Sequence, residues 1–257
     1  MKLYIFGSCS GTEPYPDRHH TAFALEENGQ LYWFDAGENC SYTAHLMGLD
    51  LLRVSHVFIS HPHMDHVGGL GNLLWTIRKL TYVKDRLPEF GGVTVHIPNM
   101  NTWNGILTVL QETEGNFNLP YPLTAVPVAD GTLLTDDNLR VTAQHNFHLP
   151  ESASGWQSYS FRIEGAGKTL LYSGDVRSPD DLHNWLQDGC DLLLMESGHH
   201  NPEEVCQHIA QTYPNVKAIH FLHHGRRILH DYDLWLARCR AAFPAVTFAN
   251  DQEVIEL

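Results

Sequence analysis

The chain has few basic residues and no long hydrophobic run. Its 257 residues include 16 Lys and Arg against 30 Asp and Glu, a formal net charge of −14, which disfavours broad binding to nucleic acid or to anionic lipid. No stretch reaches the roughly 18 apolar residues of a membrane span. The start, MKLYIFGSCSG, has too short an apolar run for a secretory signal and predicts a first strand instead. We therefore expect a protein without a membrane segment, whose anionic ligands are attracted only locally.

Cysteine is also scarce. The five cysteines are Cys9, Cys40, Cys190, Cys206 and Cys239. Their number is odd, they are widely spaced and they form no C-x-x-C pair, so neither a disulfide framework nor a cysteine-type zinc site is indicated. This usage predicts a protein of the reducing cytoplasm.

Histidine, in contrast, is abundant. There are 18 histidines in a chain whose 43% hydrophobic and 18% charged content is typical of a globular protein. Because neutral imidazole is the commonest side-chain ligand of transition metals, this excess predicts a metal site.

The hydrophobic pattern predicts strands that occur in two sets, each followed by helices. In the first half we expect strands at 2–6, 21–26, 31–37 and 54–60, and helices at 38–50 and 69–80. In the second half we expect strands at 93–98, 122–128, 139–145, 157–164, 169–173, 191–196 and 217–222, and helices at 101–113, from 178, at 202–213 and at 231–242. Two packed sheets with helices outside make an α/β four-layer αββα sandwich. No Pro/Gly/Ser-rich linker divides the chain, which predicts a single domain over residues 1–257.

The segment His61-Pro62-His63-Met64-Asp65-His66 is the central chemical signal. It lies between a predicted strand and a predicted helix, where α/β proteins place their chemistry. On extended backbone, His61 and His63 project to the same side and can bind one metal, while Asp65 and His66 can face a second. The alternative is a polar surface loop that happens to contain histidine. Three His and one Asp in six residues favour the metal site.

Further metal-binding residue types occur where later strands end. His145 and His148 follow one strand, Asp175 follows another in the triplet SGD, and His223 or His224 follows a third. Strand ends that converge on one sheet edge would build a single pocket from these residues.

At this point the sequence resembles a known family. The H-x-H-x-D-H signature, the later His, the Asp of SGD and the final His are similar to the pattern of the metallo-β-lactamase superfamily of metal-dependent hydrolases. The resemblance extends from the early D-x-G turn, Asp35 to Gly37, as far as His223. It implies the same αββα fold that the strand grouping predicts.

The resemblance also implies a dinuclear metal site with two divalent cations, Zn²⁺ being preferred over Mn²⁺ or Ni²⁺. The residues that it assigns to the first cation are His61, His63 and His148, and those of the second are Asp65, His66 and His223. Asp175 bridges the two. His145 stays open as an alternative to His148, and His224 as an alternative to His223. His220, inside the same strand, is expected to pack in the core.

Such a site activates a shared water, whose pKa falls from about 15.7 to near 7. Asp65 is expected both to bind metal and to orient the hydroxide nucleophile. Asp35 either holds a ligand histidine in the correct tautomer or only forms the turn at the end of its strand.

The bridging carboxylate of Asp175 favours phosphodiester cleavage, since true β-lactamases typically have a cysteine there. The run from Glu196 to His200 resembles a motif of the ribonuclease Z-like branch, which implies an orienting role for Glu196 and a general acid at His199 or His200. The alternative for these histidines is helix capping on a polar surface.

Transfer-RNA processing is not expected, because only 26 residues separate His148 from Asp175 and leave no room for that branch's protruding RNA-binding arm. A small anionic phosphodiester, such as a nucleotide, held by Arg226 and Arg227 fits the charge distribution better, unless these arginines are only a solvated helix start. The alternatives are a carboxylic-ester, thioester or lactone hydrolase and a tRNA 3′-processing endonuclease without the arm.

The oligomeric state stays open. Trp75, Trp103 and Trp156 either line a homodimer face or the pocket, or pack in the core, which is the commoner use of tryptophan.

Overall fold

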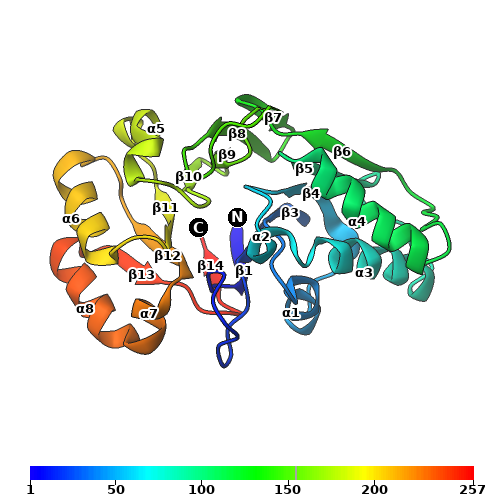
Figure 1. Ribbon diagram of the computed structural model, residues 1–257, viewed down its shortest axis with the longest axis horizontal. Coiled ribbons are helices and arrows are strands. Elements are labelled where there is room, and N and C mark those ends of the chain that lie inside the picture. Colours follow the sequence, from blue (N-terminus) through cyan, green and yellow to red (C-terminus); the bar gives the residue numbers. More distant parts are fainter. Residues whose placement is uncertain (154) are drawn as a thin grey trace. The chain divides into compact units, whose positions relative to one another are not determined.

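The chain forms two compact units, each built on one sheet. The computed structural model describes residues 1–153 and 155–257 (Figure 1). Unit 1 comprises Met1–Gly7, His19–Val128 and Asp251–Leu257, and unit 2 comprises Ser8–Arg18 and Ala129–Asn250.

Unit 1 contains a seven-stranded sheet in the order β14-β1-β2-β3-β4-β5-β6. Its strands are β1 (Lys2–Gly7), β2 (Ala22–Glu27), β3 (Gln30–Phe34), β4 (Val54–Phe58), β5 (Val93–Ile97), β6 (Leu123–Pro127) and β14 (Val254–Glu256). Its helices are α1 (Cys40–Leu46), α2 (Met64–Val67), α3 (Leu70–Val83) and α4 (Met100–Thr113), with a 3-10 turn, η1, at Leu51–Arg53. Neighbours from β14 to β3 are antiparallel and those from β3 to β6 are parallel.

Apolar periodicity explains how the helices of unit 1 attach to its sheet. Leu70, Leu73, Leu74 and Ile77 recur at the spacing of one helical face, and all four are buried in the core cluster that includes Trp33. Helices α3 and α4 lie side by side along the sheet (Figure 1).

Unit 2 contains a second seven-stranded sheet, in the order β13-β12-β11-β10-β9-β8-β7. Its strands are β7 (Gly131–Thr135), β8 (Leu139–His145), β9 (Tyr159–Gly165), β10 (Lys168–Tyr172), β11 (Leu192–Ser197), β12 (Ile219–His224) and β13 (Val246–Phe248). Its helices are α5 (His183–Asp188), α6 (Pro202–Thr212), α7 (Arg226–His230) and α8 (Tyr232–Ala242), with a 3-10 turn, η2, at Pro179–Leu182. Strands β7 to β10 pair antiparallel and β10 to β13 pair parallel, so this sheet repeats the strand pattern of the first.

The long buried strands and helices lie where the sequence predicts them. The structure adds the strands β7, β13 and β14, the helices α2 and α7 and the 3-10 turn η1, which the sequence pattern did not indicate. The three added strands lie on the edges of the sheets, where one side of the strand has no partner and the hydrophobic alternation is weak.

Several predicted boundaries were wrong, and two of them have a clear structural reason or consequence. The helix expected over 38–50 is the shorter α1, because Gly48 adopts a left-handed conformation with φ +82° directly after the helix and ends it. The strand expected to end at residue 222 runs on through His224 in β12.

Candidate functional site

In unit 1, the predicted metal-binding turn follows parallel strand β4 and is anchored by a buried carboxylate. Asp35, which directly follows β3, accepts hydrogen bonds from Ser60 N at 2.7 Å and from Ser60 Oγ at 2.8 Å. Its Oδ2 is also 2.7 Å from His66 Nδ1, and both side chains are fully buried. With Nδ1 of His66 donating to Asp35 Oδ2, Nε2 of that ring is left as a ligand atom. This is the tautomer-holding role expected for Asp35.

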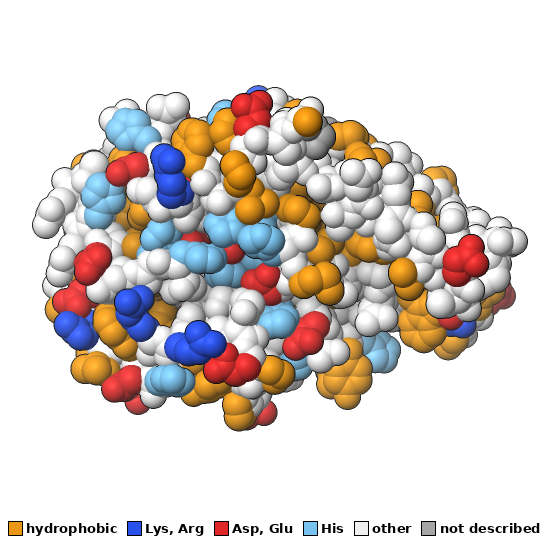
Figure 2. Space-filling view, in the orientation of Figure 1, with side chains coloured by type: hydrophobic (Ala, Val, Ile, Leu, Met, Phe, Trp, Pro, Cys, Tyr) orange, Lys and Arg blue, Asp and Glu red, His pale blue; other side chains and the backbone are white. Residues whose placement is uncertain are grey.

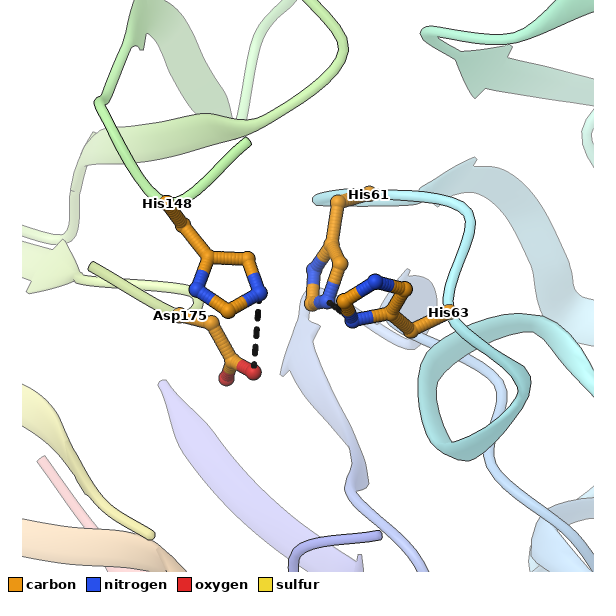
Figure 3. Close-up of side chains that lie close together, drawn as sticks. All are labelled: His61, His63, His148 and Asp175. Carbon is orange, nitrogen blue, oxygen red and sulfur yellow. Dashed lines mark hydrogen bonds and ion pairs between the residues drawn. The ribbon is translucent and has the colours of Figure 1, made fainter. Parts of the chain in front are cut away.

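The other histidines of this turn converge on one another. Ser60 Oγ lies 3.0 Å from His61 Nδ1, and because its own proton goes to Asp35 it accepts the His61 proton. His61 Nε2 is then directed to His63 Nδ1 at 3.1 Å, with the two rings nearly perpendicular (Figure 3). Asp65 Oδ2 lies 3.5 Å from His66 Nε2. Four ligand-type side chains thus occupy a single turn.

In unit 2, Asp175 is the centre of a second group of ligand-type side chains. It follows β10 and is almost fully buried. Its Oδ1 lies 3.3 Å from His223 Nε2, and its Oδ2 lies 3.8 Å from His148 Nε2, the ion pair drawn in Figure 3. The ligand atoms of Asp175, Glu196, His199 and His223 all lie within 4.8 Å of one another.

A β-bulge distinguishes His223 from His224. Along β11 and β12, Glu196 pairs with Leu222 but Ser197 pairs with His224, so His223 is the extra residue, with φ +55°. A bulge redirects the side chain of the inserted residue, here toward Asp175.

The ring of His224 has two other partners instead. Its nitrogens lie 3.0 Å from Ser197 Oγ and 2.9 Å from the Ala249 carbonyl oxygen, and burial lowers its pKa to about 3. Within unit 2, only His223 of this pair is directed to the carboxylate of Asp175. His220 is buried beside Thr247 Oγ1 at 2.7 Å, as expected of a core residue.

A similar comparison favours His148 over His145 as a ligand. His145 lies 2.7 Å from Asp130 Oδ2 and stacks on Trp156 with ring centroids 4.4 Å apart. His148 follows the end of β8 and faces Asp175.

Glu196 is a fully buried carboxylate surrounded by histidines. Its Oε1 lies 3.0 Å from His199 Nδ1 and 3.2 Å from His200 Nε2, and its Oε2 lies 3.7 Å from His223 Nδ1. Burial raises the pKa of Glu196, but these imidazoles outweigh burial and hold it well below its usual range. The bond to Glu196 in turn raises the pKa of His199. The half-exposed His199 ring is therefore oriented by a carboxylate and favoured in its protonated form.

The two arginines at α7 differ in their environment. Basic side chains gather over α7 and α8 (Figure 2), but the Arg226 guanidinium is paired with Glu13. Within the part of the chain that the structure describes, Arg227 makes no ion pair and is exposed. Arg227 is thus the better placed of the two to bind an anion.

The sequence analysis missed the residues that hold the ligand loops. Ser60 orders the unit 1 turn, Asn146 and Ser173 connect the loops of unit 2, and Gly198 makes room for the His223 ring. Small and polar residues of these types are common in loops, so the sequence alone gives no signal for their role.

Two of the tryptophans differ in their environment. Trp103 packs in the core, whereas Trp75 is 36% exposed.

With this geometry described, comparison with known proteins identifies the family. The family model described as Anti-Pycsar protein Apyc1 matches residues 1–234. The chain belongs to the Anti-Pycsar protein Apyc1 family. The match includes all of the candidate ligands in both units.

This Apyc1 family member is also similar to curated ribonucleases. It is 40% identical to ribonuclease Z of Treponema pallidum, over 29% of this chain and 24% of that relative, so it spans about a quarter of the first curated relatives that it matches. It is 26% identical to ribonuclease Z of Methanothermobacter thermautotrophicus over 100% of this chain and 97% of that relative.

A solved structure establishes the fold of the Apyc1 family member. The metallo-β-lactamase fold protein YhfI from Bacillus subtilis superposes with a TM-score of 0.76 at 16% identity and covers 100% of this chain and 98% of that protein. The prediction of the αββα metallo-β-lactamase fold is confirmed. The predicted resemblance to ribonuclease Z is confirmed by the sequence similarity over the whole chain. Among the described residues, no helix is long and apolar enough to cross a bilayer.

Proposed function

We propose that this chain is a metal-dependent phosphodiesterase that acts on a small anionic diester, and that residues 1–257 work as one domain. The observation that carries the proposal is the arrangement of the buried carboxylate of Asp175 between imidazoles, with the His199–Glu196 pair beside it. The family relationship supports the same reading, since the matched region spans ligand-type residues of both units.

The proposed metal ligands come from both units. The residues that we assign to the first cation are His61, His63 and His148, those of the second are Asp65, His66 and His223, and Asp175 would be shared by both. This assignment rests on the family pattern and on the geometry within each unit.

The spacing of the ligand atoms fits divalent cations. Two ligand atoms at about 2.0–2.1 Å from one tetrahedral Zn²⁺ lie about 3.3 Å apart. In unit 1, His61 Nε2 and His63 Nδ1 are 3.1 Å apart, and in unit 2 Asp175 Oδ1 and His223 Nε2 are 3.3 Å apart. Imidazole with carboxylate suits zinc, and Mn²⁺ or Ni²⁺ is the alternative.

When bound, the cations supply a hydroxide nucleophile at neutral pH and polarise the phosphate. The chain's own residues orient and transfer protons. Asp65, whose Oδ2 lies 3.5 Å from His66 Nε2, would orient the nucleophile toward the phosphorus. Glu196 accepts the Nδ1 proton of His199, so the opposite nitrogen of a protonated ring can give a proton to the leaving oxygen. His200 shares the Glu196 carboxylate and keeps it ionised.

Charge and chain length favour a small substrate. The net charge of −14 opposes a long polyanion. Between His148 and Asp175, the residues that the structure describes include the strands β9 and β10 and form no protruding arm. Arg227 and, when released from Glu13, Arg226 would bind the diester phosphate. We place the protein in the cytoplasm. We also propose that a homodimer contact would form at the exposed Trp75 of α3.

Hydrolysis of paired substrates tests this proposal. Zinc-loaded protein should cleave bis(p-nitrophenyl) phosphate, and Asp65→Ala should lower kcat by about 100-fold or more, because the nucleophile loses its position. A thioester and a lactone serve as comparison substrates, and a transfer-RNA precursor tests the activity for which the curated relatives are named.

Turnover of the thioester or lactone without cleavage of the diester would replace the phosphodiesterase proposal by the ester-hydrolase alternative. Rapid 3′ processing of the precursor would make RNA the substrate. Full activity in Asp65→Ala would remove that residue from the mechanism.

A further inference from the structure

Asp181 is a buried carboxylate outside the set of candidate metal ligands. It lies in the 3-10 turn η2 of unit 2 and is only 8% exposed. Aspartate is seldom buried unless its carboxylate is paired or hydrogen-bonded, because burial removes its hydration. The hydrogen-bond partners of Asp181 therefore show what offsets this cost.

One carboxylate oxygen of Asp181 binds two loops at once. Its Oδ2 accepts hydrogen bonds from Phe147 N at 3.1 Å and from Arg177 N at 3.0 Å. The backbone carbonyl oxygen of Asp181 also accepts a hydrogen bond from Gln144 Nε2 at 2.9 Å. Asp181 thus connects the loop between β8 and β9 to the segment that follows β10.

Both of these N–H groups lie next to a candidate metal ligand in the chain. Phe147 directly precedes His148, and Arg177 follows Asp175 by two residues. The side chains of His148 and Asp175 face each other, with Nε2 and Oδ2 3.8 Å apart (Figure 3). Asp181 therefore fixes the backbone beside each member of this ligand pair.

The bond to Phe147 distinguishes Asp181 from a residue that only caps its own turn. Ser178 is such a cap, since its side chain accepts a hydrogen bond from Asp180 N within η2. Asp181 instead reaches an N–H group 34 residues away in the sequence. Because this bond is non-local, it orders the two ligand loops relative to each other before a cation binds, which lowers the ordering cost of binding.

We propose that Asp181 is a positioning residue of the metal centre, which holds the loops of His148 and Asp175 together for cation binding. The inference rests on the proposed function, because that function assigns both residues to the metals. Both hydrogen bonds end on the same oxygen, Oδ2. An uncharged side chain with one oxygen at this place can therefore do the same work, so the role depends on the acceptor and not on the charge.

Three variants of the full chain test the inference by chelator competition for zinc. Asp181→Ala removes the shared acceptor and should lower zinc affinity by about 10-fold to 100-fold, the effect typical of losing a group that orients ligands. Asp181→Asn keeps an oxygen for both N–H groups and should restore most of the affinity. Asp180→Ala is the matched control, because the Asp180 carboxylate binds Tyr213 and His208. This variant should lose stability but keep its zinc affinity.

Two further measurements report the positioning itself. In the metal-free proteins, the amides of Phe147 and Arg177 should exchange hydrogen faster in Asp181→Ala than in the wild type, and Asp181→Asn should keep their protection. The visible absorption spectrum of the cobalt-substituted protein reports ligand geometry. It should change in Asp181→Ala and stay the same in Asp180→Ala.

Wild-type zinc affinity in Asp181→Ala would overturn the inference. An equal loss in Asp181→Ala and Asp181→Asn would also overturn it, because that result assigns the effect to charge. A similar loss in Asp180→Ala would do the same, since it reports general destabilisation. Should Asp181→Ala not fold, unprotected Phe147 and Arg177 amides in the wild-type protein would still refute the role.

Cleavage of bis(p-nitrophenyl) phosphate by the same samples tests the proposed function separately. A wild-type protein that binds zinc in the way described but cleaves no diester would contradict the phosphodiesterase proposal and leave the positioning role of Asp181 supported.

Discussion

At the scale of the residue, small side chains decide where the candidate ligands point. Gly198 follows β11, and a Cβ atom there would lie 2.7 Å from His223 Nδ1 and 2.9 Å from its Cε1. Because these ring atoms lie on the bulged residue of β12, the ring has little freedom to move away. Because Gly198 has no side chain, the His223 ring has the space to face Asp175.

We predict that Gly198→Ala lowers zinc affinity by about 10-fold to 100-fold, the effect typical of changing a residue that orients a ligand. Gly105 in α4 is the matched control, since a Cβ there meets nothing within 4 Å, and Gly105→Ala should keep the affinity and stabilise the helix by up to about 1 kcal/mol. Competition with a chromogenic chelator measures both. Unchanged zinc affinity in Gly198→Ala would show that His223 is not a ligand.

The sequence predicted the residue types of the candidate site but not all of their positions. His61, His63, Asp65 and His66 are close in space because they are close in sequence. The choice of His223 over His224 depends on a bulge that arises from pairing with β11, and such non-local register is not encoded in the local pattern.

At the scale of the element, a buried polar network joins the loop after β8 to the end of β10. Asn146 Oδ1 accepts from His148 N at 3.2 Å, while its Nδ2 donates to Ser160 Oγ at 3.0 Å and to the Ser173 carbonyl at 3.4 Å. Ser160 Oγ also donates to the Ser173 carbonyl. The network fixes the loop of His148 against the strand that leads to Asp175.

We predict that Asn146→Ala lowers the free energy of unfolding by about 1–3 kcal/mol, because it removes the buried amide's hydrogen bonds to Ser160 and Ser173 and the acceptor of His148 N. We also predict that it weakens zinc binding. Urea unfolding and chelator competition measure the two effects. Asn215→Ala, at an exposed asparagine, should change neither. Wild-type stability in Asn146→Ala would contradict the role given to the network.

The more deeply a strand or helix is buried, the better its position could be predicted from the sequence. The three N-terminal strands and helices α3 and α4 follow from apolar periodicity, since one face of each is covered. The edge strands β7, β13 and β14 are short, and each pairs with a neighbouring strand on one side only. Their sequences therefore show little alternation of apolar and polar residues, and their positions depend on the partner strand.

At the scale of the whole molecule, buried neutral histidines make stability depend on pH. Burial lowers the pKa of His96 in unit 1 and of His220 in unit 2 to about 4. In the unfolded chain each titrates near 6.5. The unfolded state therefore takes up protons first as the pH falls, and stability that is complete above pH 6.5 is lost between about pH 6.5 and pH 4.

We predict that the metal-free protein loses about 2 kcal/mol of unfolding free energy per buried histidine between pH 7.5 and pH 5. His220→Gln removes one of these groups, so its loss over the same interval should be smaller by about that amount. Urea unfolding at the two pH values measures both proteins. An equal loss in the variant would mean that His220 does not titrate in this way.

The central claim for the whole molecule is that ligands from both units bind two cations at one centre. The most direct measurement is anomalous diffraction at the zinc absorption edge from crystals of the zinc-loaded protein. The account predicts two anomalous peaks about 3.5–4 Å apart, with the carboxylate of Asp175 between them. A single peak, or two peaks that lie far apart and each contact only one unit, would contradict it.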